Sequence, residues 1–326
     1  MRHALISLLA GVVLVWSTAL TAQQTAGVLL FEIGIHVEPF GLSNGEITTG
    51  RSSYANEDYF HRHAEYLRLL AAVAEKHGGR LTIQVQSPFI DYAPKYDNVI
   101  GELYARGHEI GLHFHEDAHL GRDPEALSVR RWTTVVAQQV DKIKALGVDR
   151  VRQWSGGNLY SHMLEVAEAT GLDVKSDWKD PATQSIDPRL KVTTPWRPAG
   201  SPNGTDVTLF AQHDPNGKLI FLPPGISDPF GFVSDEVYAA SSPSVAVQKH
   251  WSDGLAGSLS SAAQNPTLTH TFHMTLHPGQ LQLNRLGGDT TLDTWLSREI
   301  DPLVIAGKVR WATYSQIADA YTAAGR

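Results

Sequence analysis

The chain alternates between two kinds of hydrophobic pattern, and this alternation limits its fold more than any other feature. Residues 28–37 read VLLFEIGIHV, an apolar and β-branched run typical of a buried strand, whereas residues 56–77 place apolar side chains at helical spacing. Further strand-like runs lie at 81–85, 108–113, 148–153, 269–276 and 309–313, separated by helical patterns at 98–106, 124–146, 161–170, 245–263 and 291–305. Repeated βα units form parallel strands covered by helices. The sequence therefore predicts an α/β fold, a distorted (β/α) barrel of about seven strands.

Composition excludes several classes of partner. The 326 residues are 42% hydrophobic and 19% charged, which is typical of an ordinary globular protein. The formal net charge is −7, and no run rich in Lys or Arg interrupts the chain. We therefore expect neither a nucleic-acid partner nor binding to an anionic membrane surface.

The first 22 residues have the layout of a secretory signal peptide. Arg2 precedes a short apolar run, and small residues follow up to Ala22. The run is too short for a transmembrane helix, and the chain has no cysteine that could form a disulfide or carry a lipid. We expect a secreted or periplasmic protein whose mature part, residues 23–326, is a single domain without a transmembrane segment. A long insertion is expected at about 180–266.

Polar side chains gather where the predicted strands end. His36 and Glu38 close the first strand, His113 and His115 the third, and Arg152 the next. The late strand carries His270, His273 and His277. Residues i and i+2 of a strand share one face, and the carboxyl ends of parallel strands meet at one mouth. Any one of these histidines could be a satisfied core residue or a helix cap, but four such strand ends together indicate a shared site.

The densest stretch is GHEIGLHFHEDAH, at residues 107–119. Imidazole and carboxylate groups together suit Zn²⁺ and similar divalent ions, and a catalytic site uses three protein ligands and leaves one position open. His115 and His119 are one helical turn apart, and Glu38 would complete the set. Water bound to such an ion is acidic enough to attack an acyl carbon near neutral pH.

These segments resemble the polysaccharide deacetylases that share the NodB-homology domain. The resemblance rests on GHEIGLHFHEDAH, VRQWSGG (151–157), DVKSDW (173–178), MTLH (274–277) and the closing KVRWATYSQIADAY, which occur in the family's order over residues 28–323. It implies a NodB-like barrel that removes N-acetyl or O-acetyl groups from a polysaccharide or oligosaccharide with a divalent metal ion, for which Zn²⁺ is the expected choice.

The resemblance also implies a role for each candidate residue. Glu38, His115 and His119 would hold the metal ion, and His277 would be the general acid that protonates the leaving group. Asp177 would orient the imidazole of His277. Arg152 would hold nearby carboxylates or the substrate.

Two features depart from the family's pattern. His36 stands where the family has a carboxylate base, so His36 or Asp117 could be the base, His36 could be a further ligand, or catalysis could be lost. Counting from GHEIG makes His113 the first metal ligand, whereas the H-x3-H spacing selects His115 and His119. The alternatives to a deacetylase are another metal-dependent hydrolase on a similar barrel and an inactive glycan-binding relative.

Overall fold

The computed structural model describes residues 27–38, 53–156, 158, 160–178, 186–202, 206–226, 237, 239–283 and 286–326. The expected signal peptide, residues 1–22, lies outside this part of the chain. Within the described residues, no helix combines the length and apolar character needed to cross a membrane.

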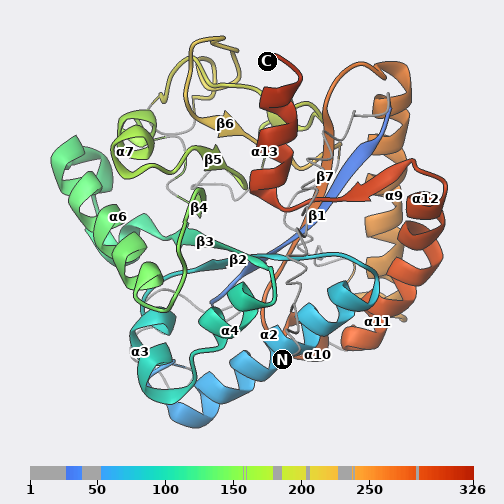
Figure 1. Ribbon diagram of the computed structural model, residues 1–326, viewed down its shortest axis with the longest axis horizontal. Helices are drawn as coiled ribbons and strands as arrows, with labels where there is room; N and C mark the ends of the chain where they lie inside the picture. Colours follow the sequence, from blue (N-terminus) through green and yellow to red (C-terminus); the bar gives the residue numbers. More distant parts are fainter. Residues whose placement is uncertain are drawn as a thin grey trace, which may run out of the picture.

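One parallel sheet of eight strands forms the centre of the molecule (Figure 1). Its strands are β1 Leu29–His36, β2 Thr82–Val85, β3 Glu109–Phe114, β4 Gln153–Gly156, β5 Val174–Lys175, β6 Ile220–Phe221, β7 His270–Leu276 and β8 Val309–Trp311. The order along the sheet is β6-β5-β4-β3-β2-β1-β7, and β8 pairs with β1. This curled half-barrel confirms the predicted fold class.

Helices surround the sheet (Figure 1). They are α2 Glu57–Lys76, α3 Phe89–Tyr96, α4 Val99–Ala105, α5 Glu116–Leu120, α6 Val129–Lys144, α7 Met163–Thr170, α9 Pro243–Gln264, α10 Gln280–Leu283, α11 Asp289–Trp295, α12 Asp301–Ile305 and α13 Tyr314–Ala323. The π-helical turn Leu296–Ile300 joins α11 to α12. The helix predicted over 291–305 is therefore present in three consecutive pieces.

The two faces of the sheet differ in chemistry, as β1 illustrates. All eight residues of β1 are buried. Leu29, Phe31, Ile33 and Ile35 join the large apolar core shared with the surrounding helices. The alternate positions include two buried polar residues, Glu32 and His36. The sheet therefore buries an apolar face under helices and encloses a largely polar interior on its other face.

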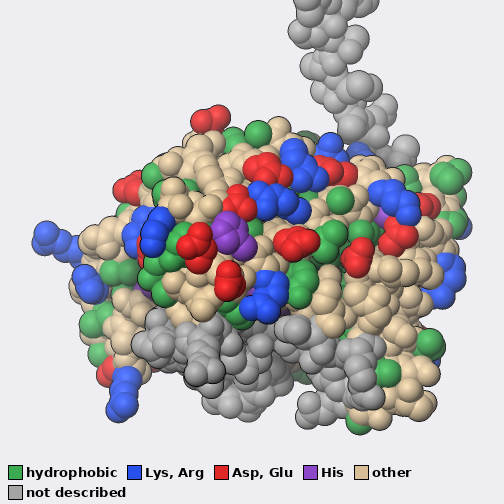
Figure 2. All heavy atoms as spheres, turned by 90° about the horizontal axis from the view of Figure 1, so that it is seen from below, with side chains coloured by type: hydrophobic (Ala, Val, Ile, Leu, Met, Phe, Trp, Pro, Cys, Tyr) green, Lys and Arg blue, Asp and Glu red, His purple; other side chains and the backbone are tan. Residues whose placement is uncertain are grey.

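Acidic and basic side chains are interspersed on the face of the molecule shown in Figure 2. Ion pairs join neighbouring elements, as where Arg68 of α2 contacts Asp97 at 2.7 Å and Lys76 contacts Asp293 at 2.6 Å.

Candidate active site

The carboxylate of Glu38 is the centre of the candidate site. Glu38 follows β1, and its Oε2 lies 2.6 Å from His115 Nε2 and 3.3 Å from His113 Nε2. Its Oε1 lies 3.3 Å from Nε2 of His277, which follows β7. Three strand ends that are far apart in sequence thus meet at one carboxylate, at the carboxyl edge of the sheet.

Glu38, His113 and His115 provide the donor set that a divalent metal ion needs. The Nε2 atoms of His113 and His115 are 2.9 Å apart, and Nδ1 of His113 contacts Ser155 Oγ at 2.7 Å. Tetrahedral ligands at about 2.0–2.2 Å from Zn²⁺ lie about 3.3 Å from one another, so these three atoms are close to the required spacing. The contact with Ser155 fixes the ring of His113, as outer partners of metal-binding histidines do. Donor atoms of His36, Glu38 and His113 also lie within 4.8 Å of one another, which places His36 beside this set.

The electrostatics of this cluster favour a cation between the three groups. Burial lowers the pKa of His113 well below its ordinary value. Burial acts in the same direction on His115, but the charge of Glu38 outweighs it and raises the pKa of His115 to about 9. The pKa of Glu38 lies well below its ordinary value because the adjacent histidines outweigh its burial. The side chains therefore form an ionised carboxylate between a neutral and a protonated imidazole, and a dication could replace the shared proton.

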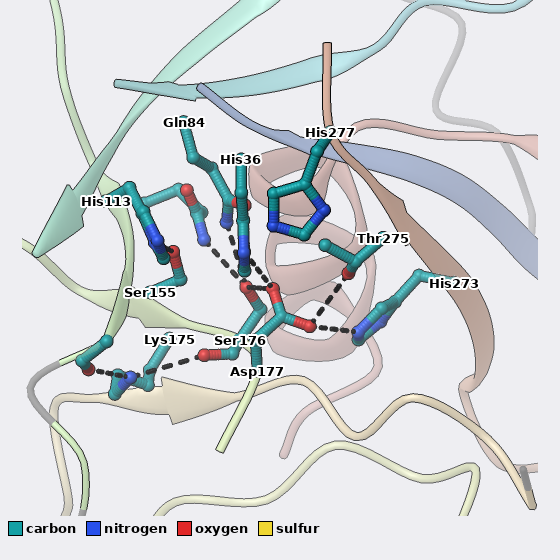
Figure 3. A network of polar contacts seen from close by, with 12 residues as sticks. His36, Gln84, His113, Ser155, Lys175, Ser176, Asp177, His273, Thr275 and His277 are labelled. Carbon is teal, nitrogen blue, oxygen red and sulfur yellow. Dashed lines mark hydrogen bonds and ion pairs between the residues drawn. The ribbon is translucent and has the colours of Figure 1, made fainter. Parts of the chain in front are cut away.

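His36 is held by Asp177 (Figure 3). Its Nε2 lies 3.2 Å from Asp177 Oδ2, and its ring stacks on His113 with the centroids 3.9 Å apart. Burial lowers the pKa of His36, which favours the neutral imidazole that a general base requires. An imidazole fixed by a buried carboxylate is the arrangement used in many hydrolases to orient the base.

Asp177 is fully engaged by its neighbours. Oδ2 also accepts a hydrogen bond from Ser176 Oγ at 2.8 Å. Oδ1 lies 3.0 Å from His273 Nε2 and accepts a hydrogen bond from Thr275 Oγ1 at 3.1 Å. Burial raises the pKa of Asp177, but His273 and the other partners outweigh it and hold this pKa well below the ordinary value. Asp177 is therefore an ionised carboxylate placed between two imidazoles.

A left-handed backbone directs Asp177 into the interior. Ser176 points inward, because its Oγ accepts hydrogen bonds from Gln84 Nε2 at 3.1 Å and Gln153 Nε2 at 2.8 Å. Strand alternation would turn the next side chain outward. Asp177 instead has φ +54°, a conformation that non-glycine residues seldom adopt outside functional or strained sites. The unusual backbone is what brings its carboxylate to His36.

Two expected residues lie apart from Glu38. His119 contacts Gln86 Oε1 at 2.9 Å, and its ring stacks on Phe114. The side chain of Gln86 lies between His119 and Glu38, and its Nε2 is 3.5 Å from Glu38 Oε2. Asp117 is exposed and accepts a hydrogen bond from the backbone of Ala118. The helical turn at α5 thus points His119 away from the carboxylate that His113 and His115 share.

The placement of Arg152 corrects a second expectation. We expected Arg152 near the end of a strand over 148–153, but β4 starts at Gln153, so Arg152 precedes the strand and lies at the amino edge of the sheet. Its guanidinium binds Asp173 at 2.8 Å and Asp319 at 2.7 Å. Arg152 does hold carboxylates, but on the edge opposite the candidate site.

The three late histidines also separate. His277 reaches Glu38, while His273 reaches Asp177. His270 begins β7, where its ring contacts Thr193 Oγ1 and the carbonyl of Asn265, each at 2.8 Å. His273 and His270 were the other candidates for the general acid. His273 contacts Asp177, and His270 lies at the opposite end of β7 from the candidate site.

Several polar residues of the site were not anticipated. They are Gln84, Gln86, Ser155, Lys175 and Ser176. Alternation along residues 82–86, TIQVQ, signals that Thr82, Gln84 and Gln86 share a face. Lys175 carries no such signal, although it is fully buried, binds the carbonyl oxygens of Gly156 and Ser176, and has its pKa lowered by burial to about 8.

Comparison with solved structures supports the fold. A protein from Mycobacterium smegmatis assigned to the polysaccharide deacetylases aligns with a TM-score of 0.58 at 13% identity, over 93% of this chain and 92% of its own. One from Pseudomonas aeruginosa PAO1 with the same assignment gives 0.59 at 15% identity, over 91% and 92%. Puue allantoinase gives 0.60 at 14% identity, over 91% of each chain. No family model matches the chain, and no curated protein matches its sequence. The chain therefore has the polysaccharide-deacetylase fold that the motifs implied, and the activity has to be argued from its own site.

Proposed function

We propose that this protein is an exported, metal-dependent deacetylase that hydrolyses N-acetyl or O-acetyl groups of a carbohydrate. The observation that carries the proposal is the meeting of Glu38 with three imidazoles at the carboxyl edge of a parallel sheet, beside the pair formed by His36 and Asp177. The order of the sequence motifs and the similarity of fold to two proteins assigned as polysaccharide deacetylases support it.

Glu38, His113 and His115 would hold the metal ion. This set differs from the H-x3-H set of the sequence motif, because His113 contacts Glu38 and His119 contacts Gln86. When bound there, a divalent ion would supply an acidified water and polarise the acyl oxygen. Ser155 keeps the ring of His113 turned toward Glu38 by binding its other nitrogen.

His36 is the general base of this proposal. With Nε2–H directed at Asp177, the second ring nitrogen of His36 takes the proton of the attacking water. The ionised Asp177 then stabilises the imidazolium that forms. A histidine thus performs the task for which the family pattern has a carboxylate.

His277 is the general acid. Its Nε2 lies 3.3 Å from Glu38 Oε1, and its backbone N–H donates to Gln280 Oε1 at 3.0 Å. His277 gives its Nε2 proton to the leaving nitrogen or oxygen, which completes the cleavage of the acyl bond.

The test is release of acetate by the purified full chain from chitooligosaccharides, peptidoglycan and acetylated xylan, before and after chelation and after readdition of Zn²⁺. We expect acetate from at least one glycan, loss on chelation and recovery with metal. His277→Ala should lower turnover by about 100-fold or more while retaining the metal. His213→Ala, which alters an exposed histidine of the 206–226 segment, is the matched control.

The set of substrates includes allantoin, because the fold is equally similar to that of an allantoinase. Hydrolysis of allantoin without acetate release from any glycan would contradict the proposal and assign the site to another class of amide. Full activity in His277→Ala would contradict the acid assignment alone.

A further inference from the structure

A buried lysine beside the candidate site has no part in the reaction proposed above. Lys175 ends β5 and is 0% exposed. A buried cation is costly unless it is paired or hydrogen-bonded, so this ammonium needs partners. Burial lowers its pKa to about 8, although the charges of Glu116 and Asp177 act in the opposite direction. Within the described residues, neither of these acids forms an ion pair with Lys175, so its direct partners lie elsewhere.

The ammonium of Lys175 binds two backbone carbonyl oxygens (Figure 3). Its Nζ donates to the carbonyl of Gly156, at the end of β4, and to the carbonyl of Ser176 at 3.2 Å. Nζ also lies over the ring of Trp154, 5.2 Å from its centre, where the ring attracts a cation. Hydrogen bonds from a charged donor are stronger than those between neutral groups. Lys175 therefore ties together the carboxyl ends of two adjacent strands.

One of these carbonyls belongs to the peptide unit that precedes Asp177. The pairing of β5 with its neighbours ends at Lys175, so the carbonyl of Ser176 lies beyond the strand. The angle φ of Asp177, +54°, is the rotation about the bond from the nitrogen of this same planar peptide to Cα. Holding the carbonyl of Ser176 therefore restrains the left-handed backbone that brings Asp177 to His36.

The other carbonyl belongs to Gly156, which directly follows Ser155. Gly156 has φ +73°, and a Cβ at this position would clash with the carbonyl oxygen of Phe114 on β3. The turn at the end of β4 thus lies tightly against β3. Ser155 Oγ is 2.7 Å from Nδ1 of His113. A shift of this turn would therefore move Ser155 relative to the ring that it contacts.

We propose that Lys175 is a positioning residue, because its ammonium holds in place the two turns from which Ser155 and Asp177 reach the imidazoles of the candidate site. These imidazoles are those of His113 and His36. The restraint on the two turns stands on the contacts alone. Its effect on metal binding and turnover rests on the proposed function, in which His113 is a ligand and His36 is the base.

Crystal structures of the metal-free full chain test the restraint directly. Lys175→Met has a side chain of similar size without a donor, whereas Lys175→Arg keeps a charged donor. We expect the wild type to show Nζ bound to both carbonyl oxygens. In Lys175→Met, Asp177 should leave the left-handed region and lose its contact with His36. An Asp177 that keeps both its left-handed backbone and this contact in Lys175→Met would overturn the proposal.

Lys175→Arg keeps the proposal testable if Lys175→Met does not fold. A guanidinium also donates to carbonyl oxygens, so we expect it to hold the carbonyl of Ser176 and to leave Asp177 left-handed. Loss of this carbonyl contact with Asp177 unmoved would overturn the proposal. A displaced Asp177 with the contact intact would overturn it as well.

Turnover and stability should respond differently to Lys175→Met. The melting temperature should change little, because the loss of two hydrogen bonds is offset by the removal of a buried charge. At saturating Zn²⁺, kcat should fall about tenfold with KM nearly unchanged, and Lys175→Arg should recover part of it. Affinity for Zn²⁺ should also fall about tenfold, as it does when outer partners of metal-binding histidines are disturbed. A lower melting temperature with unchanged kcat and metal affinity would reduce Lys175 to a structural residue.

Lys76→Met is the matched control. It makes the same substitution at a lysine of α2 whose ammonium contacts Asp293 at 2.6 Å and neither of the two turns. The backbone of Asp177, kcat and metal affinity should all remain those of the wild type. Because the crystal structures need neither metal nor substrate, they decide the role of Lys175 even if no glycan is hydrolysed.

Discussion

Glu38 contacts His113, His115 and His277, and these contacts predict how metal binding changes when each histidine is replaced. Replacing His113 or His115 with alanine removes one of the three proposed ligands, and replacing His115 also removes the positive charge that Glu38 contacts. His113→Ala and His115→Ala should therefore each weaken metal binding greatly, whereas His119→Ala should keep about one divalent ion per chain. Metal content of the purified variants measures this. Retention in His113→Ala with loss in His119→Ala would restore the H-x3-H register.

His36 can be tested by substitution with two different residues. His36→Ala should retain the metal and lose activity by about 100-fold or more, since general base catalysis typically contributes that much. His36→Asp, which restores a carboxylate, should recover part of the rate and remain active to lower pH, because an aspartate stays ionised where an imidazole takes up a proton. Rate profiles against pH and metal analysis measure both. Loss of the ion in His36→Ala would make His36 a ligand instead.

At the scale of the secondary-structure elements, Arg152 belongs to the amino edge of the sheet, opposite the candidate site. Its ion pairs join the start of β4 to Asp173, which precedes β5, and to Asp319 of α13. Because both acids are partly exposed, Arg152→Ala should lower the free energy of unfolding by only about 1 kcal/mol. Metal content and turnover should be unchanged, as judged by urea unfolding and acetate release. A variant that folds normally but loses activity would place Arg152 back in the site.

The elements that the sequence predicted are those long enough to show a period. β1, β3 and β7 were predicted within two residues at each end, so His36, His113 and His277 were correctly placed at or next to the carboxyl ends of these strands. β5 and β6 have two residues each, too few for any alternation, so they were not anticipated. The start of β4 was placed too early because the apolar residues 148 and 151 precede the strand, and this error misplaced Arg152.

Side-chain geometry was harder to predict than strand position. The choice between His113 and His119 depends on how α5 leaves β3, which a spacing rule does not contain. The contact of Asp177 with His36 depends on one left-handed residue that breaks the strand period. The deacetylase motif named Asp177 as an orienting residue, but its imidazole partners are His36 and His273.

At the scale of the whole molecule, the charge of the site couples folding to pH. In the metal-free chain, the pKa of His115 is raised from 6.5 to about 9, so the folded state binds a proton that the unfolded state has released between these values. The stabilisation from this pair is therefore fully present below about pH 6.5 and is lost as the pH rises through about 9. Melting curves with chelator should show the gap between wild type and His115→Ala narrowing over this range. A gap that widens with pH would contradict the assignment.

β1 pairs with β2, β7 and β8. Leu29, its first residue, pairs with His270 of β7 and with Val309 of β8, and both partners lie far along the chain. Because synthesis runs from the amino end toward the carboxyl end, β1 is made before β7 and β8, and it is an apolar strand with an unpaired edge until they follow. Closing so long a loop is also slow, because the entropy of the intervening chain must be lost before the strands can pair. Any factor that keeps the chain unfolded until β7 and β8 have been made would postpone this pairing and protect the open edge of β1.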